Sequence, residues 1–505
     1  MSGTAEKGMP MADAFPGNRL FYGDNLKVLR EHFKQNEAVD LIYLDPPFKS
    51  NRDYNIFFPE ENGSKSEAQL HAFKDTWEWG DEAAKEYEET VEAGGDVARA
   101  LQALRQILHQ NDMMAYLSRM AIRLKELRRV LKPTGSIYLH CDPTASHYLK
   151  ILLDSVFGPQ NFLNEIIWHY RKWPSGKYTF QRNHDVIFFY SRSPNRDRPF
   201  NQLFMNRAPS TLKRFGTAQI VSGHDEQGRR IPSRMAAHDS LGVRQDDVWD
   251  IGRVPPIKQL FPTEKPVALL EKIITASTRK GDIVLDPFCG CGTAIVAAQR
   301  LGRRWIGIDV TEAAMVVIKR RLRETFGKSV LQHTTTVGEP ESVHDARVLA
   351  QSDPYQFQWW ALGLVDARPT EKKKGADQGI DGRLYFHDEP SGGATKQVIF
   401  SVKAGTVNPA HVRDLAHVVS REKAQVGALI SMEEHTKAMR QEAASAGFYQ
   451  SPGGTKHPRL QLLTVADLLG GKHLDLPPWR EVRTFKRTER DKQIKMFTPK
   501  IPKAK

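Results

Sequence analysis

The sequence predicts an α/β protein with a large parallel-sheet domain followed by a smaller α/β domain. Apolar, β-branched runs alternate with helical patterns from Arg19 to Leu301, which is the order that builds parallel sheets. Two of these runs, 39–45 and 281–286, end on an acid followed by a tight turn. A second alternation of strands and helices begins beyond residue 354. Together these three observations predict two α/β domains, one after the other along the chain.

Composition limits the class of protein before any motif is considered. The 505 residues are enough for two to four domains, and 40% hydrophobic content can fill their cores. Three cysteines exclude a disulfide framework and favour a reducing cytoplasm. With no apolar run of about 18 residues, no membrane partner is expected. A net charge of +13 favours a polyanion such as nucleic acid, and hence a cytoplasmic, nucleoid-associated protein, although a merely basic soluble protein has the same charge.

The first half of the chain follows the strand and helix periods closely. Helix ends are marked by basic residues in the last turn and by Pro133-Thr134-Gly135. Strands are expected at 19–22, 39–44, 135–140, 165–170 and 185–190, and helices at 26–33, 113–131 and 148–157. The acidic stretch 60–96, with Trp77 and Trp79, reads either as an insertion over a site or as a solvated excursion.

The stretch Asp45-Pro46-Pro47-Phe48 follows the apolar, β-branched run 39–44. Its prolines fix φ near −65° and remove two N–H donors, so the turn holds the Asp45 carboxylate and its carbonyls in one arrangement. Such acceptors suit an exocyclic amino group, and Phe48 can stack on a flat ring. Taken alone, the same four residues also serve as a simple strand stop.

Basic residues concentrate between the two acid-ended strands. The loop 171–182 is basic and aromatic, and from Pro194 to Trp249 the apolar periodicity weakens while arginines become frequent. Arginine pairs bidentately with guanine or phosphate, so this segment suits groove contacts to DNA. A solvated surface has the same composition, and both interpretations remain open on this evidence.

A strand, a glycine-rich turn and a helix follow at 281–301, and a second strand ends on Asp309. Glycines let a backbone approach a ligand, and a distal acid can hold ribose hydroxyls, as in dinucleotide sites. The spacing, however, is not Gly-x-Gly-x-x-Gly, and Asp286 precedes the glycines. A carboxylate there repels pyrophosphate but pairs with an ammonium group, so the expected ligand is a nucleoside carrying an amino acid. Cys289 and Cys291 have no companion Cys/His pair, and no metal site is expected there.

Together these motifs resemble a known family. The run from Asp286 to Gly292 is similar to the S-adenosylmethionine motif of amino-methylating DNA methyltransferases, and Asp45 to Phe48 is similar to their catalytic motif. The catalytic motif comes first, as in the β group, in which the intervening segment is the target-recognition domain. The resemblance covers Arg19 to Phe326 and implies a Rossmann-like sheet, permuted in sequence, with both motifs at the carboxyl ends of adjacent strands.

The resemblance also implies roles for single residues and a partner. Asp45 and the Pro46 carbonyl would accept hydrogen bonds from the target amino group, with Pro47 completing the turn, and Phe48 would stack on a base flipped from double-stranded DNA. The cofactor, S-adenosyl-L-methionine, would be held by Asp24 (adenine), Asp309 (ribose), Asp286 with Phe288, Gly290 and Gly292 (methionine), and Thr263 with Lys265 (methionine carboxylate). Resemblance to the β group also permits a homodimer, although no interface can be identified in the sequence.

The identity of the methylated base rests on one position. Aspartate at the first catalytic position resembles adenine-N6 enzymes, whereas cytosine-N4 enzymes more often have serine there, so adenine is favoured and cytosine-N4 is the alternative. A regulator that binds DNA without transferring methyl is a further alternative.

The C-terminal region resembles restriction-endonuclease-like domains of the Mrr kind, in which an Asp and a Glu/Gln-x-Lys bind a divalent metal. Asp381 and Lys403 match this pattern, but Ser401 stands where the second acid belongs, and serine is a poor ligand for Mg²⁺. A non-cleaving domain is favoured, and a bifunctional restriction-modification protein using Mg²⁺ is the alternative.

These patterns divide the chain into successive segments. They are a catalytic half (17–193), a candidate target-recognition segment (194–250), a cofactor-binding half (251–330), a linker (331–353), an endonuclease-like domain (354–480) and a basic tail (481–505).

Overall fold

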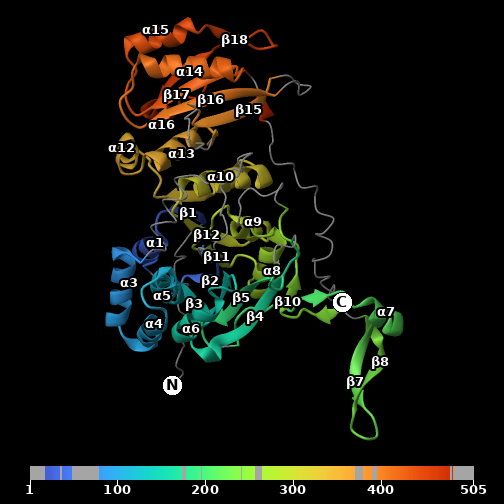
Figure 1. Ribbon diagram of the computed structural model, residues 1–505. Coiled ribbons are helices and arrows are strands. Elements are labelled where there is room, and N and C mark those ends of the chain that lie inside the picture. Colours follow the sequence, from blue (N-terminus) through green and yellow to red (C-terminus); the bar gives the residue numbers. More distant parts are fainter. Residues whose placement is uncertain are drawn as a thin grey trace, which may run out of the picture. The chain divides into compact units, whose positions relative to one another are not determined.

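The computed structural model (Figure 1) separates the chain into two compact units, Met1–Glu339 and Pro340–Lys505. Each unit is described by itself. The structure describes residues 17–34, 37–47, 79–172, 178–194, 196–239, 241–255, 264–369, 379–388, 395–477 and 480–481. Phe48, Trp77, Thr263 and the tail beyond 481 therefore lie outside the described residues.

A nine-stranded mixed sheet forms the centre of the first unit, in the order β10-β4-β5-β3-β2-β11-β12-β1-β13. The pairings from β3 through β13 are all parallel, whereas β5 runs antiparallel to both β3 and β4. The strands are β1 Asn18–Tyr22, β2 Val39–Leu44, β3 Leu131–Cys141, β4 Phe162–His169, β5 His184–Ser191, β10 Val248–Asp250, β11 Ile283–Asp286, β12 Arg304–Asp309 and β13 Thr334–Val337. The predicted α/β class is confirmed, and β2 and β11, which precede the two motifs, are adjacent as expected.

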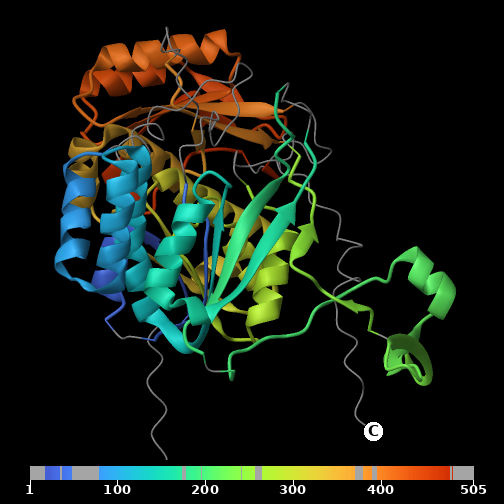
Figure 2. The same cartoon turned by 60° about the horizontal axis from the view of Figure 1, so that its bottom comes forward.

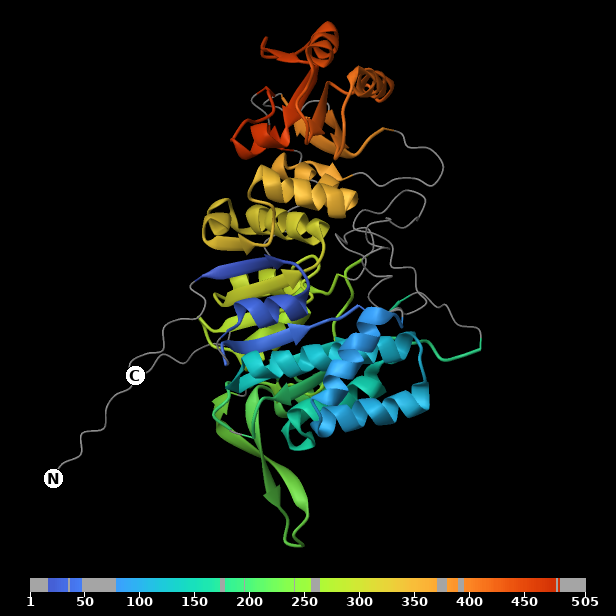
Figure 3. The same cartoon turned by 90° about the vertical axis from the view of Figure 1, so that its left-hand side faces the viewer.

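Helices cover this sheet, and Figure 2 shows the cyan helices and the yellow-green helices on different sides of it. The larger core contains apolar side chains of α1 and of α3 to α6 packed against the sheet, and Figure 3 shows α3 to α5 gathered together. The helices of the unit are α1 Asn25–His32, α3 Asp81–Glu92, α4 Gly95–Leu108, α5 Asp112–Val130, α6 Ser146–Phe157, α7 Pro209–Phe215, α8 Val267–Ser277, α9 Thr293–Arg300, α10 Glu312–Phe326 and α11 Ser329–Gln332. A short 3-10 turn, Pro159–Asn161, follows α6.

Local sequence explains where the principal helices begin. The Asn111 side chain accepts a hydrogen bond from the Met114 N–H and starts α5, and the Thr311 side chain starts α10 in the same way. Along α5, Leu117, Met120 and Leu124 are fully buried at helical spacing. This helix is therefore fixed by both its cap and its apolar stripe, of which the stripe was predicted from the sequence.

Two segments differ from expectation. The acidic stretch 60–96, interpreted as an insertion over a site or a solvated excursion, contains α3, whose Ala83, Tyr87 and Thr90 are buried at helical spacing beneath a charged outer surface. The segment 331–353, expected to be a linker, contains β13, which pairs with β1, and α12 Val343–Ser352. Neither α3 nor α12 was expected from the sequence, because polar residues outnumber a narrow buried stripe in both helices.

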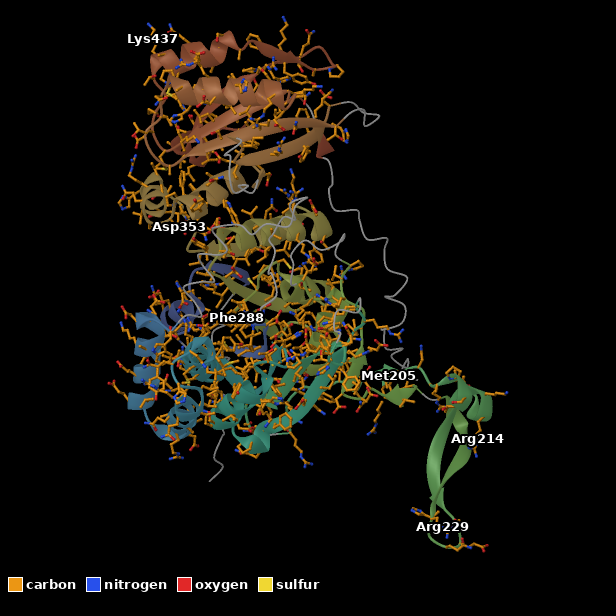
Figure 4. The ribbon with its side chains drawn as sticks, in the orientation of Figure 1. Met205, Arg214, Arg229, Phe288, Asp353 and Lys437 are labelled. Atoms are coloured by element: carbon orange, nitrogen blue, oxygen red, sulfur yellow. The ribbon has the colours of Figure 1, made fainter. Side chains whose placement is uncertain are left out.

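Most of the arginine-rich segment forms an arm. Strands β7 Ala218–His224 and β8 Arg230–Asp239 pair with each other, and the short pair β6 Phe204–Met205 and β9 Val243–Arg244 lies at the base of this hairpin. Figure 4 shows Arg214, on α7, and Arg229, at the hairpin turn, on this arm. At the end of the segment, β10 joins the edge of the main sheet through β4.

The second unit is a smaller α/β domain, as predicted. Its sheet has the order β14-β15-β16-β17-β20, with β21 beside β15. One core lies under α12, α13 and α16, and a second lies under α14 and α15, so helices cover both sides of the sheet. Besides α12, its elements are α13 Pro354–Leu364, β14 Arg368–Pro369, β15 Gly382–His387, β16 Lys396–Lys403, α14 Pro409–Arg421, β17 Val426–Ser431, α15 Lys437–Ser445, β18 Phe448–Gln450, β19 Lys456–Pro458, β20 Leu460–Thr464, α16 Val465–Leu469 and β21 Arg480–Glu481.

Membrane-crossing helices are absent from the part of the chain that the structure describes. None of the described helices combines the length and the apolar character that a bilayer crossing needs.

Candidate active site

Four parallel strands end at the same edge of the large sheet, and each carries a polar residue there. Asp45 follows β2, Asp286 ends β11, Asp309 ends β12 and Asp24 follows β1. Register keeps them together, because Asp286 lies opposite Gly307 of β12, and Tyr22 of β1 lies opposite Asp309. In open parallel sheets this carboxyl edge is where ligands bind. The two motifs therefore lie at the carboxyl ends of adjacent strands, as the family resemblance implied.

Asp45 forms an ion pair with Lys265, which comes from the segment just before α8. Both side chains are largely enclosed, with exposed fractions of 26% for Asp45 and 16% for Lys265. Pro46 is buried and Pro47 is half-buried. The pairing brings together two sequence-predicted residues that lie 220 positions apart. Sequence reasoning had assigned Lys265 to the cofactor carboxylate and had no reason to place it beside Asp45.

The glycine-rich turn after β11 has the geometry that its glycines allow. Gly290 and Gly292 have φ of +48° and +74°, values that other residues adopt only with strain. A Cβ on Gly292 would come within 2.9 Å of Ile318 Cγ1, so a side chain there would also displace α10. The turn is pinned by Cys289 N–H, which donates to Ile308 O at 3.1 Å. This backbone can therefore pass close to a ligand.

Asp286 is a buried carboxylate, only 4% exposed. It accepts a hydrogen bond from the Phe288 N–H at 3.1 Å. Burial raises its pKa well above the ordinary range, the Phe288 hydrogen bond opposes that rise, and the charges of Asp45 and Asp309 add to it. An arriving cation would relieve this accumulation of negative charge, as the ammonium or sulfonium group of an amino-acid nucleoside would.

Asp309 connects the glycine-rich turn after β11 with the turn after β12. One carboxylate oxygen accepts from Gly290 N–H at 2.8 Å, and the other accepts from Thr311 N–H at 2.9 Å and from Thr311 Oγ1 at 2.7 Å. Burial raises its pKa, and the bonds from Thr311 and Gly290 oppose this. The side chain thus holds the glycine turn against the end of β12.

Asp24 has local partners that sequence reasoning did not foresee. Its carboxylate caps α1 through Lys27 N–H at 3.1 Å and pairs with Arg123 Nη2 at 2.8 Å. Burial alone would raise its pKa, but the charge of Arg123 and the bond from Lys27 lower it below the ordinary value. Arg123, on α5, is only 5% exposed, and nothing in the sequence indicated this burial.

Arg123 also reaches the cofactor turn through Asn25. Its Nε donates to Asn25 Oδ1 at 2.7 Å, and Asn25 Nδ2 donates to Pro287 O at 2.8 Å. On the other side, Arg123 Nη1 pairs with Glu86 of α3 at 3.0 Å. The helix that sequence reasoning missed therefore contributes to the network beneath the glycine turn.

A second arginine supports the segment that carries Lys265. Arg321 of α10 pairs with Glu264 at 2.8 Å and donates to Cys291 O at 3.2 Å. The pair is buried, with side-chain exposed fractions of 10% and 6%. Arg321 thereby connects the glycine turn to the residue next to Lys265, and neither contact was visible in sequence.

An aromatic and acidic cluster lies behind Asp45, and sequence reasoning missed it. His140 of β3 is 1% exposed, with Nδ1 3.0 Å from Tyr43 Oη and Nε2 3.2 Å from Asp185 Oδ2. Tyr170 Oη donates to Asp185 Oδ1 at 3.0 Å. Burial would raise the pKa of Asp185, but the bond and charge of His140 lower it to about 2. The signal in sequence was only a histidine and an acid at strand ends.

Metal ligation has no support in the described residues. Cys289 and Cys291 are buried, and burial raises the pKa of both thiols. Among the residues that the structure describes, no three His, Cys, Asp or Glu side chains are placed to share an ion.

The nuclease-like residues of the second unit also come together. Asp381 Oδ2 accepts from Val402 N–H at 2.7 Å and lies 3.4 Å from Ser401 Oγ and 3.9 Å from Lys403 Nζ. The expected second acid is absent from this cluster because Ser401 occupies its position. The lone carboxylate is compensated by its own neighbours.

The fold and site define a class: a Rossmann-like α/β protein in which an acid-first glycine turn and an Asp-Pro-Pro turn end adjacent parallel strands. A family model described as DNA methylase, covering N6 and N4 methyltransferases, matches residues 39–320, more than half of the chain. The chain belongs to this DNA methylase family.

Curated relatives agree with this family. The type II methyltransferase M.HpaI of Haemophilus parainfluenzae is 30% identical over 313 residues, which cover 61% of this chain and 75% of that protein. M.EcaI of Enterobacter cloacae is 26% identical, covering 60% and 69%, and M.HinfI of Haemophilus influenzae is 25% identical, covering 61% and 68%. The chain thus resembles type II methyltransferases over most of its first unit.

The second unit matches a different model, described as NACHT-associated inactive Restriction Endonuclease 1, over residues 355–470. The expected endonuclease-like fold is confirmed. The model describes an inactive nuclease, which agrees with the serine at position 401.

Proposed function

We propose that this protein transfers a methyl group from S-adenosyl-L-methionine to the N6 amino group of a flipped adenine in double-stranded DNA. One observation carries the proposal: the Asp45 turn and the Asp286 turn end paired neighbouring strands, β2 and β11, at one sheet edge. A nucleophile held by the first turn therefore lies beside a cofactor held by the second. When bound, the cofactor supplies an electrophilic methyl group on a sulfonium sulfur.

The donor set suits that cofactor. Asp286 and Asp309 are enclosed carboxylates with raised pKa values, so they favour a ligand that carries positive charge and hydroxyl donors. Gly290 and Gly292 leave room for close approach of the methionine part. In this proposal Asp286 with Phe288 and the two glycines holds the methionine part, Asp309 the ribose and Asp24 the adenine. Thr263 and Lys265 contact the methionine carboxylate.

Asp45 acts on the target base. Its carboxylate and the Pro46 carbonyl accept the two N–H donors of the amino group, which draws the nitrogen lone pair out of conjugation with the ring. The nitrogen would take the methyl group as the electrons of the C–S bond stay on sulfur, and its excess proton would pass to the Asp45 carboxylate that accepts its hydrogen bond. Pro47 fixes the turn, and Phe48 stacks on the flipped ring.

In this proposal Lys265 has two successive roles, first as the partner of Asp45 and then as a contact of the methionine carboxylate. Its ammonium pairs with Asp45 in the structure. It lies before α8, next to Glu264, which Arg321 ties to the glycine turn. In the proposal Lys265 positions the Asp45 carboxylate, which accepts from the target amino group.

DNA is the expected partner because the family modifies DNA and the chain carries a net charge of +13. The segment 194–250, with Arg214 and Arg229 on its arm, reads the recognition sequence. The second unit serves as a non-cleaving binding domain without Mg²⁺. The protein acts in the cytoplasm on nucleoid DNA, and a homodimer would place two arms on one duplex.

Long-read sequencing of DNA from a host expressing the protein tests the proposal. Modified adenines in a fixed sequence context are expected with the wild type and absent with Asp45→Ala. Asp414→Ala, at an exposed position of α14, is the control and should leave the modification unchanged. Nucleoside mass spectrometry distinguishes N6-methyladenine from N4-methylcytosine. Absence of any methylated base with the wild type would refute methyl transfer, and N4-methylcytosine would refute the adenine assignment.

A further inference from the structure

Two aromatic rings in the loop between β4 and β5, the strands labelled in Figure 1, stand almost entirely in solvent. Tyr178 is 97% exposed and Phe180 is 98% exposed. They are the most exposed of the large apolar side chains identified in the described part of the chain, where the others reach at most 70%. Aromatic rings normally bury much of their surface, so two uncovered rings close together indicate a surface that acquires a partner.

The base of this loop is fixed. Tyr170 N–H donates to Asn183 O at 2.8 Å, which closes the loop at the ends of the two strands. Tyr170 Oη donates to Asp185 at 3.0 Å, and the Trp168 ring lies 4.9 Å from the Tyr170 ring. The rings at positions 178 and 180 are therefore carried by a loop with a rigid stem.

That stem belongs to the reaction edge of the sheet. Asp185 lies 3.2 Å from His140, and His140 lies 3.0 Å from Tyr43 Oη, two residues before Asp45. Strand register agrees, because Leu44 of β2 lies opposite Leu139 of β3, one residue before His140. The loop thus rises from the edge at which Asp45 would meet a flipped base.

The loop also has the charge of a nucleic-acid contact. Residues 170–183 include basic residues on both sides of the aromatic pair, Arg171 and Lys172 before it and Arg182 after it, and contain no acid. Basic residues interleaved with exposed rings favour a polyanion with stacked bases over an apolar protein partner.

We propose that Tyr178 and Phe180 insert into the DNA base stack beside the target pair and occupy the space that the extruded adenine leaves. This inference rests on the proposed function and assigns it a duplex-opening element. Extrusion costs the stacking and pairing of one base, and an aromatic ring that stacks on the neighbouring bases offsets part of that cost. Phe48 has a different role, since it stacks on the extruded base itself.

The test compares two duplexes that differ only opposite the target adenine. One carries the paired thymine and the other carries an abasic site, which removes the pairing that insertion must overcome. The target context comes from the sequencing experiment above. The full-length wild type is measured beside Tyr178→Ala/Phe180→Ala, with single-turnover methylation as the readout. A parallel duplex with 2-aminopurine at the target reports extrusion by its fluorescence.

On the paired duplex we expect the double variant to react on the order of 10- to 100-fold more slowly and to lose the 2-aminopurine signal. On the abasic duplex its rate should return to within about threefold of the wild type, because the base needs little help to leave the stack. Tyr178→Phe/Phe180→Tyr keeps both rings and should keep the wild-type rate on both duplexes. Phe448→Ala, a 65% exposed ring of the second unit, should also behave as wild type.

Equal losses on the two duplexes would overturn the insertion role and indicate a general binding loop. No loss on the paired duplex would overturn it as well. Failure of the wild type on both duplexes would instead refute the proposed function. Since both side chains are exposed, an unchanged melting temperature of the double variant is expected and excludes misfolding.

Discussion

The two units treat a carboxylate at a strand end in opposite ways. In the first unit Asp45, Asp286 and Asp309 are enclosed at one edge, where their mutual repulsion contributes to the raised pKa of Asp286. In the second unit Asp381 accepts the Val402 N–H, and Lys403 is its nearby cation. The first arrangement needs a cationic ligand, whereas the second satisfies itself. Several carboxylates gathered at one strand edge are therefore a better sign of a working site than the presence of a single motif acid.

Asp286→Asn gives the largest expected effect on the first site. Removing the buried charge should weaken S-adenosylmethionine binding on the order of 100-fold, because a charge-assisted contact to the ammonium group is lost. The same change should raise the melting temperature of the free protein, since burying a carboxylate there costs stability. Calorimetric titration and thermal unfolding measure the two effects. If Asp286→Asn weakened cofactor binding without raising the melting temperature, the proposed contrast between the enclosed acids of the first unit and Asp381 of the second would be wrong.

The pH dependence follows from the same pKa direction. Because the folded pKa of Asp286 is raised, its burial costs no stability below the unfolded pKa. The cost appears as pH rises above that value and is complete above the folded pKa. The stability difference between Asp286→Asn and the wild type should therefore grow with pH, and cofactor affinity of the wild type should fall as the carboxylate protonates. A pH-independent difference would contradict the assignment.

Arg123→Ala should have a smaller effect on the same site. Arg123 contacts no reacting atom in the proposal, but it holds Asp24 and, through Asn25, the Pro287 carbonyl of the cofactor turn. We expect the KM for the cofactor to rise about tenfold while kcat at saturation stays within about twofold, with partial rescue by Arg123→Lys.

The matched control for that change is Arg119→Ala, one turn earlier on α5. Arg119 is also buried and pairs with Glu82 and Glu86 of α3, so its loss costs similar stability. If both variants raised the cofactor KM equally, the effect would come from loosening of α3 and α5 and the positioning role of Arg123 would be wrong.

The features that could be predicted from the sequence are those that depend on the local order of strands and helices. Alternating strands and helices place Asp45, Asp286 and Asp309 at one edge because parallel strands end together, and the structure has that arrangement. Prediction from the sequence failed where a contact joins distant segments, as in the Lys265–Asp45 pair at a separation of 220 residues. Such pairs depend on how elements pack, which local periodicity does not encode.

The misread segments have a related cause. In α3 only Ala83, Tyr87 and Thr90 are buried, and the surrounding Glu and Lys residues left an insertion over a site and a solvated excursion both open. In the expected linker, β13 is a short edge strand of four threonine-rich residues with no buried member. Edge strands and helices with charged outer surfaces carry weak periodic signals, although tertiary contacts order them.

The smallest expected effect on methylation belongs to the second unit. Lys403→Ala and Ser401→Glu should leave the methylation rate within about twofold of wild type, because neither residue belongs to the proposed methyltransferase site. Wild type with Mg²⁺ should not cut unmodified plasmid DNA, since one carboxylate is a poor magnesium site. Ser401 Oγ lies 3.4 Å from Asp381 Oδ2, so Ser401→Glu adds an acid next to Asp381 and should produce measurable Mn²⁺ binding by calorimetry. If the wild type cleaved the plasmid and Lys403→Ala abolished this cleavage, Asp381 would be part of a working site even though its own neighbours balance its charge.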